Sequence, residues 1–79
     1  MLFRMEGFGR YVWPEKEEYE GEYKNDKRHG KGKFKWPDGR MYDGYFEDGK
    51  KHGEAYYTDK KGERKKGIWR DGKLIEWLE

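Results

Sequence analysis

The side chains of this sequence that could carry chemistry are two histidines and several runs of lysine and arginine. His29 and His52 each stand directly before a glycine, and imidazole can act as a proton carrier or a metal ligand. The chain has no cysteine and no serine to accompany them. We therefore expect each histidine to fix a loop by a hydrogen bond, and we predict no catalytic residue, no metal and no cofactor.

The most visible cluster of basic residues comprises Lys24, Lys27, Arg28, Lys31, Lys33 and Lys35. Clustered cations attract the anionic head groups of phospholipids. Three of them, Lys31, Lys33 and Lys35, alternate along a predicted strand and should face the acidic residues Glu20 and Glu22 of its partner. The candidates for binding acidic phospholipid are therefore the cations expected in loops, which are Lys27, Arg28, Lys50 and Lys51.

Composition limits the classes of protein and of partner. The chain has 79 residues, of which 46% are charged, 32% hydrophobic and 19% aromatic, so its core must be built from aromatic rings. The formal net charge of +2 is small. Because the lysines alternate with the aromatic residues, rings and lysines should lie on opposite faces of the strands, and this separation disfavours stacking of nucleic-acid bases. No segment is apolar enough to span a membrane or to serve as a signal peptide. We expect a cytoplasmic protein that is either free or peripheral at a membrane or the cytoskeleton.

The sequence repeats with a period of 23 residues. Gly7, Gly30 and Gly53 are evenly spaced, as are Gly21, Gly44 and Gly67. Within the repeat, aromatic residues and glycines alternate with charged residues, which is typical of strands. Polar turn formers separate the alternating segments, with loops expected at 25–29 and 47–51 and a tight turn at Trp36-Pro37-Asp38-Gly39. These features predict an all-β fold, a single-layer curved antiparallel meander of about six strands in repeated hairpins. Residues 73–79 should form a last strand or a short helical cap.

Glycines inside the predicted strands need an explanation, because glycine weakens a strand interior. We expect aromatic rings of neighbouring strands to lie over the bare main chain at these positions. The predicted aromatic face, for packing or for interaction, comprises Tyr11, Trp13, Tyr19, Tyr23, Phe34, Trp36, Tyr42, Phe46, Tyr57 and Trp69. The predicted structural residues are Gly21, Gly30, Gly32, Gly44, Gly53, Gly67, His29 and His52.

The repeat resembles the MORN repeat (membrane occupation and recognition nexus). The resemblance rests on Tyr19-Glu20-Gly21-Glu22-Tyr23 followed by His29-Gly30-Lys31-Gly32, and on the same pattern from Tyr42 to Gly53. Ala55 replaces a usual glycine, and Lys65 a usual tyrosine. We expect one domain over residues 1–79, with a partial repeat at 6–17, full repeats at 18–40 and 41–63, and a partial repeat with the cap at 64–79. The partial first unit favours a segment of a longer array.

The resemblance implies the hairpin meander and two kinds of role. MORN repeats occur in junctophilins, lipid kinases, ciliary proteins and cytoskeletal scaffolds, where protein assembly and binding of acidic phospholipid are the proposed activities. Three alternatives stay open for this chain. It is a non-catalytic module for protein–protein scaffolding or self-association, a peripheral binder of acidic phospholipids, or an engineered or excised repeat unit without an activity of its own.

Overall fold

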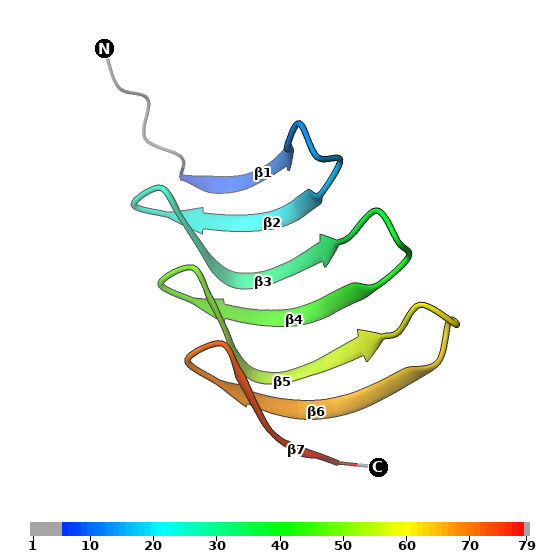
Figure 1. The fold of residues 1–79 in the computed structure, drawn as a ribbon. Helices are drawn as coiled ribbons and strands as arrows, with labels where there is room; N and C mark the ends of the chain where they lie inside the picture. Colours follow the sequence, from blue (N-terminus) through cyan, green and yellow to red (C-terminus); the bar gives the residue numbers. More distant parts are fainter. Residues whose placement is uncertain (1–5, 79) are drawn as a thin grey trace.

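The computed structural model describes residues 6–78, which form one antiparallel sheet of seven strands in chain order (Figure 1). Residues 1–5 and 79 of the predicted domain lie outside the described residues. The strands are β1 (Gly7–Val12), β2 (Glu18–Lys24), β3 (Lys27–Lys35), β4 (Met41–Glu47), β5 (Lys50–Thr58), β6 (Arg64–Arg70) and β7 (Lys73–Trp77). The all-β meander is confirmed. The tail forms a seventh strand, because it pairs with β6.

Connections of two kinds alternate along the chain, one kind at each end of the strands (Figure 1). At one end of the strands the turns have only two residues, as at Asn25-Asp26 and Asp48-Gly49. All four of these residues have positive φ, between 49° and 81°. This is the pattern of the type I′ turn that suits a tight hairpin. The prediction of five-residue loops at 25–29 and 47–51 was wrong, since both hairpins pair up to their central two residues.

The connections at the other end of the strands have more residues and repeat one geometry. The N–H of Gly39 donates to the carbonyl of Trp36 at 3.1 Å, and Trp36 in turn donates to Arg40 at 2.9 Å. The same pair of hydrogen bonds recurs in the connections at residues 13–17 and 59–63. The turn predicted from Trp36-Pro37-Asp38-Gly39 is confirmed, with proline presetting its first central position.

A row of small residues crosses the sheet at right angles to the strands. Register places Gly9, Gly21, Gly32, Gly44, Ala55 and Gly67 side by side on six neighbouring strands. A Cβ added at Gly32 would collide with the ring and hydroxyl of Tyr19, so ring packing over glycine is confirmed there. At Gly44 the obstacle is different, because its Cβ would meet the main chain and Cβ of Ala55. The row therefore lets paired strands approach closely.

Bulges interrupt the pairing of β2 with β3 and of β4 with β5. Gly30 and Gly53 lie in these segments with φ of 68° and 77°, a conformation that residues with a Cβ rarely adopt. Their expected role under a ring was wrong. A Cβ at Gly30 would meet the carboxylate of Glu22, and a Cβ at Gly53 would make only ordinary contacts with Tyr45, 3.8 Å from its Cβ and 4.0 Å from its ring.

Two buried tyrosines satisfy the main chain at the bulges. The hydroxyl of Tyr19 donates to the carbonyl of Glu22 at 2.9 Å, and that of Tyr42 donates to Tyr45 at 2.7 Å. Both side chains are 0% exposed. Because burial penalises the phenolate, the pKa of each hydroxyl is raised from 10.0 to about 12. The tyrosine that recurs in the two full repeats is thus both a core residue and the hydrogen-bond donor to a main-chain carbonyl at the bulge.

The core is a row of rings in edge-to-face contact. Centroids lie 5.0–5.2 Å apart along the order Tyr23, Tyr19, Phe46, Tyr42 and Trp69. Each of these residues is at most 8% exposed, and Phe34 and Ala55 complete the buried set. Rings arranged in this way contribute packing energy beyond the area they bury. One buried row therefore connects all the hairpins.

Candidate functional site: a cation–aromatic groove

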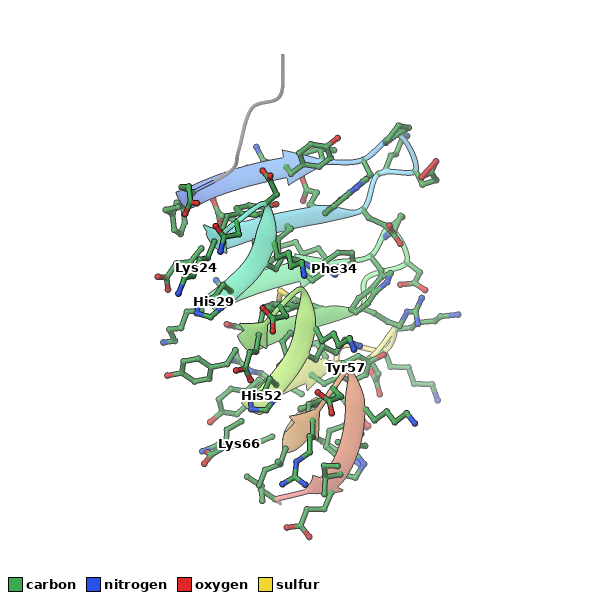
Figure 2. All side chains as sticks on the ribbon, turned by 90° about the vertical axis from the view of Figure 1, so that its left-hand side faces the viewer. Lys24, His29, Phe34, His52, Tyr57 and Lys66 are labelled. Atoms are coloured by element: carbon green, nitrogen blue, oxygen red, sulfur yellow. The ribbon has the colours of Figure 1, made fainter. Side chains whose placement is uncertain are left out.

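A second row of rings lies beside the buried one and is partly open to solvent. It runs through Tyr11, Trp13, Phe34, Trp36, Tyr57 and Trp77, with centroids 4.7–6.5 Å apart. Trp13, Trp36 and Tyr57 pack against the core while remaining partly exposed, and Trp77 is 40% exposed. Figure 2 shows Phe34 and Tyr57 on the side of the sheet opposite Lys24 and Lys66. The predicted aromatic face is present, and Trp77 extends it.

Arg28 lies on this aromatic face. Its guanidinium carbon is 5.2 Å from the ring centroid of Phe34, 5.3 Å from Phe46 and 5.9 Å from Tyr19. Its Nη2 donates a hydrogen bond of 2.7 Å to the carbonyl of Gly49 in the next hairpin. The N–H of Gly49 donates back to the carbonyl of Arg28 at 2.9 Å. One hydrogen bond and three rings therefore hold the guanidinium in place, and the second hydrogen bond joins the main chain of Arg28 to the next hairpin.

Lys51 occupies the same place one repeat later. Its Nζ lies 5.1 Å from the ring centroid of Trp36 and 5.6 Å from that of Tyr42. Its main-chain carbonyl accepts a hydrogen bond of 3.0 Å from the N–H of Gly72, which repeats the tie between Arg28 and Gly49. Burial lowers the pKa of the Lys51 ammonium, and the neighbouring charges of Arg28 and Arg40 lower it further.

Between these two cations lies a groove of about 280 Å³. We name it the cation–aromatic groove; it is lined by Arg28, Phe34, Trp36, Phe46, Gly49, Lys50, Lys51 and Gly72. Within residues 6–78, the ion pairs involve neither Arg28 nor Lys51. The groove thus combines partly exposed ring surface with two positive charges that no carboxylate of the described residues neutralises. This arrangement can hold an anion next to an apolar group.

The four cations predicted to bind lipid are divided by the structure. Lys27 and Lys50 follow the tight turns and are exposed, whereas Arg28 and Lys51 are only partly exposed and reach onto the aromatic face. Their expected place in loops was wrong, because all four belong to strands. Extending the strand alternation from Phe34 back to Arg28 would have placed Arg28 on the aromatic face, but the polar composition of the segment indicated a loop. The lipid assignment itself stays a prediction.

The face opposite the rings carries pairs of opposite charge. Lys33 lies in register between Glu20 of β2 and Asp43 of β4, and Lys35 lies opposite Glu18. The expected pairing with Glu20 or Glu22 is therefore confirmed for Lys33. It was wrong for Lys35, which faces Glu18, and for Lys31, which lies at the bulge where the register with β2 is interrupted. Glu22 has a further role, because its Oε2 accepts a hydrogen bond of 3.0 Å from the main-chain N–H of Lys31 at the bulge.

The two histidines do not share one role. Nε2 of His52 lies 3.2 Å from Oε2 of Glu47 across the second hairpin. The residue in that position of the first hairpin is Lys24, and no side-chain hydrogen bond of His29 occurs within the described residues. The expectation of a loop-fixing hydrogen bond at both positions was wrong for His29, since a lysine cannot accept one.

Two further findings concern the described part of the chain. Residues 6–78 contain no group of three or more histidine, aspartate and glutamate side chains that could hold a metal ion. They also contain no helix long and apolar enough to cross a membrane.

The model of the MORN repeat matches the chain at residues 4–16, 19–39 and 42–64. The chain belongs to the MORN-repeat family. A comparison with curated protein sequences gives no match. The first two matched segments of this MORN array each contribute a pair of rings to the partly exposed row, Tyr11 with Trp13 and Phe34 with Trp36, and the third segment contributes Tyr57. The groove lies where the second and third segments meet.

Proposed function

We propose that this MORN array is a non-catalytic module that binds other proteins through its aromatic face. The observation that carries the proposal is the second row of rings. The buried row alone already connects the hairpins, yet Trp13, Trp36 and Tyr57 remain partly exposed beside it. Exposed aromatic rings held by a rigid sheet are typical anchors of protein interfaces, because they bury a large area with little loss of side-chain freedom.

Selection from a displayed library of random short peptides tests this proposal, followed by measurement of the selected peptides with synthetic copies. Trp36→Ala should weaken binding at least tenfold, since interface tryptophans are frequent hot spots. Tyr45→Ala and Tyr56→Ala are the matched controls, because both rings are exposed, at 47% and 37%, and lie outside the aromatic rows. Peptides that bind all three variants alike would contradict the proposal. Circular dichroism verifies that each variant is folded.

Self-association is one form of the same proposal, with a second copy of the chain as the partner. Light scattering over a wide range of concentration tests it directly. A mass that stays at that of one chain, 9.7 kDa, at high concentration excludes this form and leaves binding of other proteins.

The second candidate is peripheral binding to acidic phospholipid, and one observation favours it. Lys27, Lys50 and Lys73 are exposed at the first positions of β3, β5 and β7, so each hairpin presents a lysine beside its tight turn, at the same end of the strands (Figure 1). Asp26, Asp48 and Asp71 stand in the same turns and offset this charge. Co-sedimentation with phosphoinositide vesicles should therefore be weak, and it should disappear in Lys27→Glu/Lys50→Glu.

A further inference from the structure

The cations of the cation–aromatic groove are placed where a charge is costly. A charge removed from water needs a counter-ion or hydrogen bonds, and within residues 6–78 neither Arg28 nor Lys51 has a carboxylate partner. Arg28 keeps one hydrogen bond, to the carbonyl of Gly49. The charges of Arg28 and Arg40 both disfavour protonation of Lys51, which means that like charges act on it. An anion in the groove would offset this repulsion.

The surroundings of the two cations favour a particular kind of anion. The groove is lined by Phe34, Trp36 and Phe46, with Lys51 over the ring of Trp36 and Arg28 over the rings of Phe34 and Phe46. Transfer of a doubly charged phosphate to such a site costs more than transfer of a singly charged carboxylate. Rings beside the cations also provide a surface for an apolar side chain next to that carboxylate.

We propose that the cation–aromatic groove binds an acidic peptide segment, with one carboxylate side chain between Arg28 and Lys51 and an apolar side chain on Trp36. The inference rests on the proposed function and names the chemistry of its partner. A lipid surface fits less well, because both cations are partly buried between the turns and the rings, whereas a bilayer would first meet the exposed Lys27 and Lys50.

The repeat adds a prediction about spacing. The position of Arg28 and Lys51 is occupied by Leu74 in the last hairpin, and Leu74 is 41% exposed. Alternate strands of a sheet are about 10 Å apart, which an extended peptide spans in about three residues. A segment that crosses the strands from Lys51 to Leu74 should therefore carry, besides the apolar side chain on Trp36, a second apolar residue that contacts Leu74. This residue should stand about three positions away from the acidic one.

The experiment uses the peptides selected from the random library and measures their affinity by fluorescence polarisation. We expect selection to enrich aspartate or glutamate, with an aliphatic or aromatic residue about three positions away. Lys51→Met should weaken binding at least tenfold, because it removes a charge that is shielded from solvent. The matched control is Lys27→Met, the same change at an exposed lysine outside the groove lining, and it should alter the affinity less than twofold.

A change in the peptide tests the same contact without altering the protein. Replacement of the selected glutamate by glutamine should cost at least as much affinity for the unmodified chain as Lys51→Met costs. It should cost less for the Lys51→Met variant, in which only Arg28 still faces the carboxylate. Melting curves verify the fold of both lysine variants. Non-additive losses of this kind would support a direct contact between the carboxylate and Lys51.

Other outcomes overturn the inference in distinguishable ways. Peptides that depend on Trp36 but show no acidic preference, or that bind Lys51→Met normally, would contradict the acidic partner and leave the proposed function intact. Failure to obtain any peptide that depends on Trp36 would contradict both. Phosphoinositide vesicles that bind through Lys51, in the absence of binding to acidic peptides, would assign the groove to a lipid head group instead.

Discussion

Gly44 is a residue at which a small substitution should have a large effect on stability. A Cβ at this position would overlap the Cβ of Ala55 and lie 2.7 Å from the Cα of Ala55 and 2.8 Å from the carbonyl oxygen of Glu54. Ordinary contacts of this kind are close to 4 Å. Two of the three obstacles are main-chain atoms of β5, so no side-chain rotation can relieve them. Gly44→Ala must separate β4 from β5.

The cost follows from the contacts that are lost. Overpacking of a closely packed site costs about 1–3 kcal/mol, and each weakened ladder hydrogen bond adds about 0.5–1.5 kcal/mol. We expect Gly44→Ala to lower the free energy of unfolding by about 2–4 kcal/mol. For a domain of this size, that corresponds to a fall in Tm of roughly 10–30 °C.

Thermal denaturation followed by circular dichroism measures the effect, and urea denaturation verifies the size. Gly9→Ala is the matched control, because it belongs to the same row and its added Cβ would lie 3.8 Å from the ring of Tyr23, an ordinary contact. The double variant Gly44→Ala/Ala55→Gly should recover part of the loss, since one obstacle is removed. A Tm for Gly44→Ala within about 2 °C of Gly9→Ala would refute the close approach of β4 and β5.

Two predictions concern the buried tyrosines. Tyr42→Phe should cost about 1–3 kcal/mol in urea denaturation, because it leaves the carbonyl of Tyr45 without its partner, whereas Tyr45→Phe on the opposite face should be neutral; equal effects would contradict the role of the hydroxyl. Alkaline pH should destabilise the fold between pH 10 and 12, because Tyr19 and Tyr42 keep their protons to about 12 when folded and lose them near 10.0 when unfolded. Each contributes up to about 2–3 kcal/mol that is lost across this range, and an absorbance titration in which all tyrosines ionise together near 10 would contradict it.

Much of the fold could be predicted, since the signals for it are local. Alternation of Tyr19, Gly21 and Tyr23 with charged residues indicated a strand with one aromatic face, and burial of Tyr19 and Tyr23 confirms it. The turn at Trp36-Pro37-Asp38-Gly39 was predicted from residue types alone and is confirmed. These features depend on neighbours a few residues apart, which a sequence displays directly.

The candidate site could be predicted only in part. Its rings at Phe34, Trp36 and Phe46 were expected on one face, but the cations beside them were expected in loops. Composition misled here, because Asn25-Asp26 already turns the chain and the polar residues that follow are paired in β3. The role of Gly30 was missed for a related reason, since its positive φ arises from a bulge against β2.

By itself the sequence determined the period of 23 residues, the hairpins and the aromatic face, because strand alternation and turn chemistry act over short stretches of chain. Only the tertiary structure decided that Arg28 and Lys51 lie over rings instead of reaching into solvent. That placement depends on bulged pairing with the preceding strand and on hydrogen bonds to Gly49 and Gly72 in the following hairpin. Such contacts join residues about one repeat apart, and they exist only when the strands lie side by side.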